Sequence, residues 1–410
     1  MMQESAARLA RLDAPRCIQA CRPRHAVTFR AASRVRGEET GITGAAYAAR
    51  HLTAIVASLP EISMVRFGRK KTTIGLDIGS GLIKVAVVDH GKSEPELVKV
   101  SISPLIADAI VEGEVMDPGI VAGAIKDALV AAGVPVKNVV TAVGGRDVII
   151  KKIQIARAKE HEARDVIRWE AEQHVPFDME SVELDFQILD PHGSDPEMAV
   201  LLVAAKRDLV ENKMRLLTDA EVTPSIVDVD AFALHNAFEL NYPEAMHGVV
   251  CLVNIGHEVT NINILDDGVP LLTRDIAVGT RRLREDLQRE RGLSVEQADA
   301  LLQGYEQSPH LQAVLSTRGE EIAVGMERAA AFLATSSRAS SPLKTVYTCG
   351  GGARVPGLTE MLASRLRMSV EQANPLQRLR VRDGAFDALV IDEVAPLLML
   401  PIGLALRKAA

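Results

Sequence analysis

The chain has 410 residues, of which 47% are hydrophobic and 25% charged, so it is long enough for two or three globular domains with sizeable cores. Its net charge of −7, from 47 basic and 54 acidic side chains, argues against a protein that binds nucleic acid mainly through phosphate contacts. Four cysteines are too few for a disulfide framework and indicate a reducing, cytoplasmic setting.

The first 63 residues differ in composition from the rest, because they are rich in arginine and contain no lysine. No apolar segment typical of a signal peptide follows their basic start. Met64 opens the run M-V-R-F-G-R-K-K directly before the first strongly β-branched segment, which is typical of a natural start. We therefore expect residues 1–63 to be a disordered extension or a misassigned start.

An internal repeat follows. Residues 72–89 read T-T-I-G-L-D-I-G-S-G-L-I-K-V-A-V-V-D, which predicts a hairpin with a tight glycine turn, and residues 250–266 have the same form. A constant offset of 177 aligns Asp77 with Asn254, Gly79 with Gly256 and Asp89 with Asp266. Such self-similarity predicts a duplicated unit, here two related lobes.

Between and after these hairpins, helical and strand patterns alternate, which predicts an α/β protein. We expect helices at 118–132, 161–174, 207–220, 279–303 and 319–336, and strands at 139–143, 182–189, 198–205 and 345–349. The resulting division is a first lobe at 64–149, an inserted subdomain at 150–198, the first lobe again at 199–248 and a second lobe at 249–380. The apolar run at 394–406 is shorter than the ~20 residues of a membrane span, so residues 381–410 are predicted to form a buried helix that returns to the first lobe.

Three glycine turns indicate a phosphate ligand. The turn after Asp77 would direct successive backbone N–H groups into one concavity, and Lys84 on the returning strand would add a positive charge. Asp77 itself suits a hydrated divalent ion, since Mg²⁺ prefers carboxylate, water and phosphate oxygens. Ordinary hairpins also use glycine, but a second such turn at Gly256 and a third at Gly350 favour a common ligand.

These motifs resemble those of the actin, sugar-kinase and heat-shock-chaperone ATPase superfamily. D-x-G-S-G-x-x-K at 77–84 resembles its first phosphate loop, residues 254–260 its second, and residues 350–358 its adenosine motif. The order of the pieces is most similar to the PilM family of type IV pilus assembly proteins, through the start at 64, W-E-A-E-Q-H-V-P-F at 169–177, V-D-V-D-A-F-A-L at 227–234 and P-L-L-M-L-P-I-G-L-A-L-R at 396–407. The resemblance covers about residues 64–410 and implies an actin-like, ribonuclease-H-like duplicated two-lobe fold with an inserted subdomain, as in the related FtsA.

The resemblance also implies a role for each matching residue. Asp77 and Asp230 would be catalytic, Asp77 would be the Mg²⁺ ligand, and Asp228 is an alternative to Asp230 for orienting the attacking water. Lys84 and Asp230 also have a simpler interpretation as solvated charges. The residues that would bind ATP are Asp77, Gly79, Ser80, Gly81, Lys84, Asn254, Gly256, Thr260, Gly350, Gly351 and Gly352.

One position departs from the family pattern, because Asn254 stands where an Asp is usual. An amide accepts a hydrogen bond but has no charge with which to attract Mg²⁺ or help activate water. We therefore expect ATP binding with weak or no hydrolysis. The adjacent His257 is interpreted as an exposed bystander.

The resemblance favours an ATP-binding cytoplasmic scaffold that is peripheral at the inner membrane and contacts other pilus inner-membrane assembly proteins. It would dock the N-terminal cytoplasmic tail of PilN in a groove between the first lobe and the inserted subdomain. Two alternatives remain open. A small-molecule kinase of the same superfold would need a carboxylate in the cleft to accept a substrate proton, and an FtsA-like division protein would need a detachable amphipathic C-terminal helix.

Overall fold

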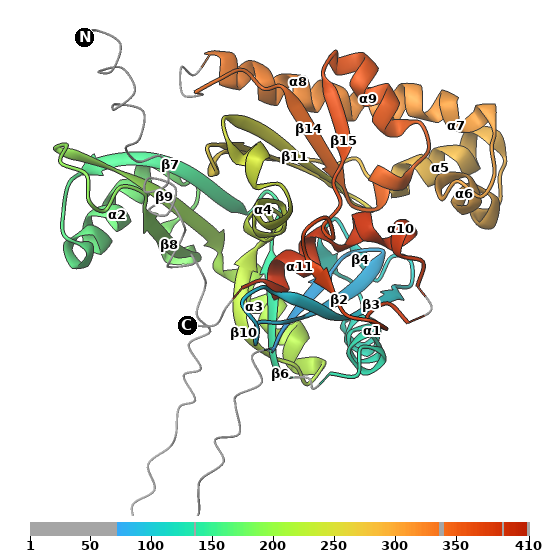
Figure 1. The fold of residues 1–410 in the computed structure, drawn as a ribbon, viewed down its shortest axis with the longest axis horizontal. Helices are drawn as coiled ribbons and strands as arrows, with labels where there is room; N and C mark the ends of the chain where they lie inside the picture. Colours follow the sequence, from blue (N-terminus) through green and yellow to red (C-terminus); the bar gives the residue numbers. More distant parts are fainter. Residues whose placement is uncertain (1–71, 135–136, 336–339, 388, 408–410) are drawn as a thin grey trace, which may run out of the picture.

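The computed structural model describes residues 72–134, 137–335, 340–387 and 389–407 (Figure 1). The predictions for residues 1–63 lie outside this part of the chain. Two mixed sheets, each with helices on its outer face, lie on either side of a shared helical layer, and a third sheet projects to one side. No helix in the described ranges is long and apolar enough to cross a membrane.

The first sheet has the strand order β10-β6-β1-β2-β3-β16. Its strands β1, β2 and β3 form an antiparallel meander, whereas β6, β10 and β16 join by parallel pairing. Alternate residues of β1 and β2 pack beneath α1 and α3, while the opposite face packs against α4 and α11. The bounds are β1 Thr72–Ile78, β2 Leu82–Asp89, β3 Glu96–Pro104, β6 Lys137–Val143, β10 Thr223–Val229, β16 Arg380–Val381, α1 Pro118–Ala131, α3 Arg207–Asp219, α4 Asp230–Asn241 and α11 Met399–Ala405.

The second sheet has the order β13-β12-β11-β14-β15 and carries α5 to α9 on one face. Its other face contributes to the same core as α4 and α11, so these two helices lie between the sheets. The bounds are β11 Val249–Ile255, β12 Thr260–Asp266, β13 Val269–Ile276, β14 Thr345–Cys349, β15 Ser369–Gln372, α5 Thr280–Arg291, α6 Val295–Leu302, α7 Pro309–Val314, α8 Glu320–Thr335 and α9 Leu358–Leu366.

The duplication predicted from the sequence is present in the strand register. In the first hairpin Thr72 pairs with Asp89 and Ile78 with Ile83. Adding 177 to each number gives the pairs of the second hairpin, from Val249 with Asp266 to Ile255 with Thr260. The two hairpins are therefore equivalent in pairing as well as in sequence.

A third sheet of order β7-β9-β8 carries α2 (Glu160–His174) and has an apolar core of its own. Its strands are β7 (Val148–Ala156), β8 (Val182–Ile188) and β9 (Glu197–Lys206). We expected the strand at 198–205 to resume the first lobe, but β9 is instead the central strand of this third sheet. The error has a physical reason: a buried central strand has the same apolar sequence in either sheet.

Two helical predictions also need correction. The helix expected at 279–303 is two helices, because Gly292 ends α5 in the left-handed conformation and Ser294 caps the start of α6. The C-terminal run is a series of short segments: α10 (Ile391–Val394), a 3₁₀ turn at Ala395–Leu398, and α11. All seven residues of α11 are buried, as expected for a core helix rather than a detachable one.

The shorter elements complete the chain. Strands β4 (Ile110–Val111) and β5 (Glu114–Val115) form a small hairpin beside the first sheet. Single helical turns are found at η1 Met179–Ser181, η2 Pro243–Met246, η3 Leu315–Gly319 and η4 Gly351–Arg354, and η3 is a π-helical turn.

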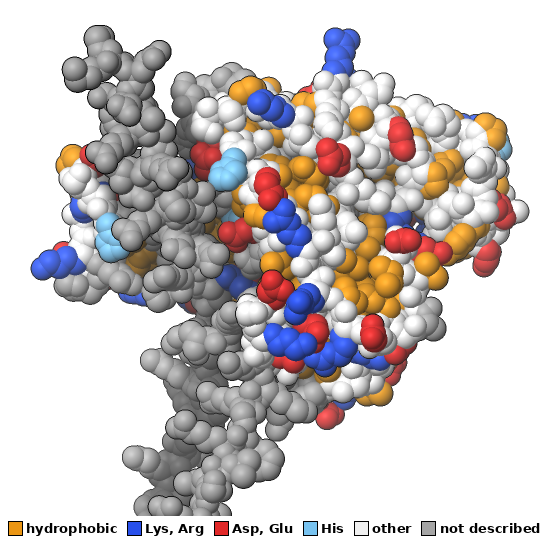
Figure 2. Space-filling view, in the orientation of Figure 1, with side chains coloured by type: hydrophobic (Ala, Val, Ile, Leu, Met, Phe, Trp, Pro, Cys, Tyr) orange, Lys and Arg blue, Asp and Glu red, His pale blue; other side chains and the backbone are white. Residues whose placement is uncertain are grey.

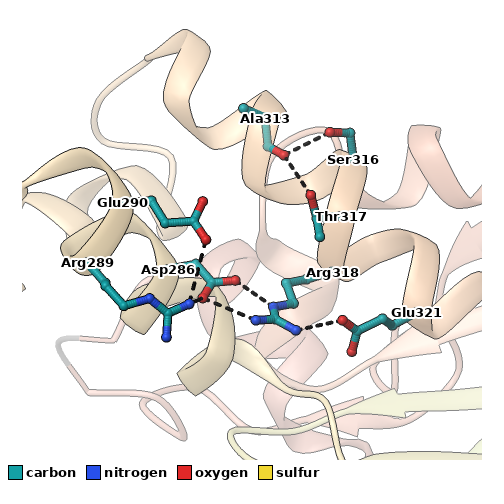
Figure 3. A network of polar contacts seen from close by, with 8 residues as sticks. All are labelled: Asp286, Arg289, Glu290, Ala313, Ser316, Thr317, Arg318 and Glu321. Atoms are coloured by element: carbon teal, nitrogen blue, oxygen red, sulfur yellow. Dashed lines mark hydrogen bonds and ion pairs between the residues drawn. The ribbon is translucent and has the colours of Figure 1, made fainter.

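A buried ion pair joins the helices of the second lobe (Figure 3). Asp286 on α5 is 4% exposed and accepts hydrogen bonds from Arg318 in the π-helical turn at 2.5 and 3.2 Å. Arg289 donates to the same carboxylate at 2.6 Å, and Arg318 also donates to Glu321 at 2.6 Å. The network therefore fixes α5 against the junction of η3 and α8.

The face shown in Figure 2 carries acidic and basic side chains in alternation among its described residues. Ion pairs among the described residues include Arg382 with Glu96 and Arg378 with Glu244. This interspersed pattern is ordinary for a soluble surface.

Candidate functional site

The first glycine turn links β1 to β2. The Gly79 N–H donates to the Leu82 carbonyl at 3.1 Å and closes the turn. Within the described ranges, the N–H groups of Ser80 and Gly81 have no hydrogen-bond partner in the protein. They are therefore available to an anion, as the sequence predicted for this turn.

Asp77 and Lys84 lie opposite each other at the base of this turn. They are register partners across β1 and β2, and the Lys84 Nζ lies 2.6 Å from the Asp77 carboxylate. Nζ also lies 3.9 Å from the point where a Cβ on Gly79 would stand, so the ammonium is beside the turn. The simpler interpretation of Lys84 as a freely solvated charge is wrong, since its side chain is 15% exposed and paired.

The second turn, between β11 and β12, repeats this arrangement. The Gly256 N–H donates to the Val259 carbonyl at 2.9 Å, again the equivalent bond at an offset of 177. Thr260 is fully buried and its hydroxyl donates to the Val278 carbonyl at 2.7 Å. This bond fixes the chain that leads into α5, so the hydroxyl proton of Thr260 is already engaged.

His257 brings the two turns together. Its Cγ lies 3.0 Å from the position of a Cβ on Gly81, so the imidazole packs against the first turn from the second lobe. Desolvation, assisted by the charges of Arg284 and Arg281, lowers the pKa of His257 to about 4. The expectation of an exposed bystander is therefore wrong, because the ring is half-buried at the contact between the lobes.

Asn254 belongs to a chain of amides that continues into the second lobe. Its Nδ2 donates to Asn261 Oδ1 at 3.3 Å, and Asn261 Nδ2 donates to Asp275 Oδ1 at 2.7 Å. Asn261 is the equivalent of Lys84 at the offset of 177, which is the signal that would have identified it from the sequence. Asp275, on β13, carries no such signal.

The third turn, at 350–352, packs onto the end of β11. A Cβ on Gly350 would lie 2.4 Å from Asn254 Oδ1, and one on Gly352 would lie 2.1 Å from the Ile255 side chain. The Gly350 N–H donates to the Pro396 carbonyl at 2.8 Å. Close packing thus accounts for glycine at both positions, while contact of Gly350, Gly351 and Gly352 with an adenosine stays a prediction.

The two acids of the connecting segment differ in their surroundings. Asp228 is fully buried and its carboxylate is held by Arg407 at 2.5 and 2.8 Å, so it is engaged in holding the C-terminal segment. Asp230, the first residue of α4, lies against the backbone at Gly144. Of the two, Asp230 is the one free to face the site.

The electrostatics of Asp230 are unusual for a carboxyl group. Burial, together with the charge of Asp77, raises its pKa to about 7, against the opposing effects of Lys213 and Lys84. Lys213 on α3 was missed by sequence reasoning. Desolvation lowers the pKa of Lys213, while the charges of Asp230 and Asp77 oppose this shift. Asp77 from β1, Asp230 from α4 and Lys213 from α3 thus converge on one place.

These residues fit a phosphate-bearing ligand with Mg²⁺. The first turn has free N–H groups, the second turn packs against it through His257, and an ammonium and a carboxylate lie at the base of the first. Among the described side chains, no group of three or more His, Cys, Asp or Glu is arranged to hold a metal by itself. A Mg²⁺ at Asp77 would therefore take its other ligands from water and phosphate, which is its usual preference.

Comparison with known proteins gives the family. A structure described as the "PilM-PilN type IV pilus biogenesis complex" is 26% identical with a TM-score of 0.72, and the match covers 82% of this chain and 98% of that one. EutJ from Carboxydothermus hydrogenoformans is 16% identical, with a TM-score of 0.49 and coverage of 82% and 89%. MreB 5 of Spiroplasma citri, determined with bound AMPPNP, is 12% identical, with a TM-score of 0.43 and coverage of 81% and 94%.

The first of these matches confirms the predicted actin-like α/β fold. A family model described as "Type IV pilus assembly protein PilM" matches residues 75–409, which is nearly all of the chain that the structure describes. The chain therefore belongs to the PilM family of type IV pilus assembly proteins.

Proposed function

We propose that this protein is an ATP-binding scaffold of the type IV pilus inner-membrane assembly complex and docks the N-terminal cytoplasmic segment of a PilN-type membrane protein. The observation that carries the proposal is the match to a PilM–PilN complex over 98% of the matched chain. Such a scaffold would be cytoplasmic and held at the inner membrane by its partners, including other pilus assembly proteins.

ATP would bind between the two glycine turns. The N–H groups of Ser80 and Gly81 and the ammonium of Lys84 would hold phosphate oxygens, with Gly256 in the opposing turn. Asp77 would hold a Mg²⁺, which would neutralise phosphate charge. Asp230 would orient a water toward the phosphates, and glycines 350–352 would lie beside the adenosine.

Hydrolysis would be weak because the second lobe has no carboxylate at the end of β11. Asn254 Nδ2 donates to Asn261, which in turn donates to Asp275, so the amide is held as part of a hydrogen-bonded chain. An Asp at this position would add the charge that attracts Mg²⁺ and helps activate water. The expected activity is therefore nucleotide-dependent closure with little turnover.

The third sheet offers a route from closure to partner binding. It packs on the first lobe through a core shared by β6, β9, β10 and α4, and it touches the second lobe where β7 lies beside β13. A change in the angle between the lobes would alter the seam between this sheet and the first lobe. We place the PilN segment in that seam, where nucleotide would bias its binding.

The nucleotide part is tested on the full chain by calorimetry with ATP and Mg²⁺, together with steady-state phosphate release. We expect micromolar binding that is lost in Lys84→Ala, and negligible release that increases in Asn254→Asp. Lys92→Ala is the matched control, since Lys92 is an exposed lysine in the loop after β2. Rapid release by the unmodified chain would sink the interpretation of Asn254 and favour a kinase or motor.

The partner is tested by titrating a synthetic N-terminal PilN peptide into the full chain, with and without ATP. Arg207 and Glu183 bridge α3 and β8 across the proposed seam at 2.9 Å, and both side chains are about half-exposed. Arg207→Glu should weaken the peptide affinity, whereas Lys126→Glu on α1 should not. Unchanged affinity in Arg207→Glu would move the peptide to another surface.

A further inference from the structure

Four oxygen-bearing side chains form a block on one face of the second sheet. Asn261 pairs in register with Asp275, and Asn263 pairs with Thr273, across the antiparallel strands β12 and β13. Residues two apart on a strand share a face, and directly opposite residues have Cβ atoms about 5 Å apart. The four side chains are therefore close neighbours that face the first lobe.

This block lines a small cavity between the lobes. The cavity has a volume of about 20 Å³, enough for one water-sized occupant. Its lining includes Asn263, Thr273 and Asp275 from the second lobe and Asp230 on the opposite side. Gly144 and Gly145 also line it, with the Asp230 carboxylate against the first and Asp275 Oδ2 3.9 Å from the Cβ position of the second.

Two oxygens in this lining have no partner. Asn263 is 1% exposed; its Nδ2 donates to the Ala231 carbonyl at 3.0 Å, while its Oδ1 is buried without a hydrogen bond. Thr273 Oγ1 is also buried without one. A buried polar atom without a partner loses its hydration and gains nothing in return, so both oxygens point to an occupant.

The charged groups around the cavity also favour a bound cation. Within the described ranges no basic side chain forms an ion pair with Asp275, and its carboxylate accepts a hydrogen bond from Asn261 Nδ2 at 2.7 Å. Burial raises the pKa of Asp275, and Asp275 in turn helps to raise that of Asp230. Besides Asp275, the charged groups of other elements that act on Asp230 are Asp77, Lys213 and Lys84. Two carboxyl groups thus face one cavity, and their negative charge is only partly neutralised.

We propose that this cavity binds one hard divalent cation, through the oxygens of Asn263, Thr273 and Asp275 and the carboxylate of Asp230 across the lobe interface. Carboxylate, amide and hydroxyl oxygens are ligands that Mg²⁺ and Ca²⁺ prefer. The site adjoins the one predicted at Asp77 and shares Asp230 with it, but its ligands are all protein side chains and it needs no nucleotide. Because its ligands come from both lobes, the ion would favour the closed arrangement.

The test uses the full chain, freed of metal and nucleotide. Mg²⁺ is titrated by calorimetry, and Mn²⁺ binding is followed by electron paramagnetic resonance. We expect one site with a Kd of about 0.1–1 mM, weakened about 10-fold or more in Asp275→Asn. Asp127→Asn, on the exposed side of α1, is the carboxylate control that should bind as the unmodified chain does.

Three results would overturn the proposal. One is an absence of binding up to about 10 mM, which would leave the cavity to a water. Another is binding that Asp77→Asn abolishes and Asp275→Asn spares, which would place the ion at the phosphate turn. If circular dichroism shows that Asp275→Asn does not fold, Thr273→Val is used in its place, because it is isosteric and removes one ligand. The third overturning result is an unchanged Mg²⁺ affinity in Thr273→Val. Loss of ATP binding in any of these chains bears on the proposed function and not on this site.

Discussion

At the scale of single residues, the two lobes differ most where their hairpins are equivalent. The first lobe pairs Asp77 with Lys84, and the second pairs Asn254 with Asn261. The first pair is a salt bridge at 2.6 Å, while the second is a hydrogen bond between neutral amides at 3.3 Å. The duplicated fold has therefore kept the shape of the site in both lobes but its charge in only one.

Asp230 gives a prediction about pH. Its pKa is about 7 in the folded protein against 3.8 ordinarily, so the folded state holds a proton that the unfolded state releases between about pH 4 and 7. By linkage, the free energy of unfolding falls as pH rises through this window. Asp230→Asn removes the effect. At pH 8 the free energy of unfolding of this variant should exceed that of the unmodified chain by about 1–3 kcal/mol, so the variant should also melt at a higher temperature. Near pH 4 the two chains should differ little.

Thermal melts of both chains in metal-free buffer between pH 4 and 8 measure this difference. Asp228→Asn is the contrasting variant, because it breaks the buried pair with Arg407 and should be destabilising across the whole range. An Asp230→Asn chain whose stability tracks the unmodified one at every pH would contradict the assignment of a raised pKa.

At the scale of elements, α11 is the central element of the molecule. It contacts α4, β1 and β2, and its residues belong to the core that lies between the two sheets. Glycine allows this close approach: a Cβ on Gly403 would lie 1.7 Å from the Ala233 carbonyl oxygen, and one on Gly75 would lie 2.0 Å from the Pro401 carbonyl oxygen. The last described helix is therefore part of the central core of the fold.

Gly403→Ala should destabilise the protein by about 1–3 kcal/mol or more, because the added methyl group forces α11 away from α4. Gly123→Ala is the matched control. Gly123 also lies inside a helix, but nothing stands within 4 Å of its Cβ position. There the change should stabilise by about 0.5–1 kcal/mol. Urea unfolding of both variants measures the contrast, and equal losses would contradict the packing argument.

The buried network of the second lobe gives another prediction (Figure 3). Asp286→Ala leaves Arg318 without its main partner and should cost about 3 kcal/mol of unfolding free energy. Glu290→Ala removes a half-exposed acid of the same helix, 3.6 Å from Arg289, and should change stability by less than about 0.5 kcal/mol. Denaturant titration distinguishes the two, and similar midpoints would show that the network contributes little.

At the scale of the whole molecule, a polar latch joins the lobes beside the glycine turns. Arg281 on α5 pairs with Asp108 of the first lobe at 2.7 Å and with Glu258 of the second turn at 2.9 Å. Glu258 also accepts a hydrogen bond from the Glu112 N–H at 2.9 Å. Asp108 and Glu112 both adopt positive φ, a conformation that costs energy in non-glycine residues and is typical of functional loops.

Arg281→Ala should loosen the closed arrangement without unfolding either lobe. Exposed pairs of this kind contribute about 1 kcal/mol or less each, so we expect a several-fold faster amide exchange confined to residues 105–112 and 256–259. Hydrogen-exchange mass spectrometry measures it, with Arg365→Ala as control, since Arg365 forms comparable half-exposed pairs within the second lobe alone. Exchange that stays unchanged, or that rises everywhere, would count against a latch.

Much of the fold could be predicted from the sequence, because its signals are local. Alternating apolar residues and glycine turns identified both hairpins, and a constant spacing of 177 identified their duplication. The limits of α2 and β14 followed from periodicity and breakers in the same way. The boundary between α5 and α6 is marked by a single glycine, Gly292, in a polar stretch. This signal was too weak, so the two helices were predicted as one.

Other features were decided only by tertiary packing. Neither the sheet to which β9 belongs nor the close contact of His257 with Gly81 depends on residues that are near in sequence. The place of Lys213 and Asp275 beside Asp230 is likewise fixed by three separate elements that meet at the lobe interface. The sequence by itself determined where the glycine turns lie, because backbone conformation is local. Burial and charge coupling belong to the assembled lobes, and these determine which carboxyl groups are free to act.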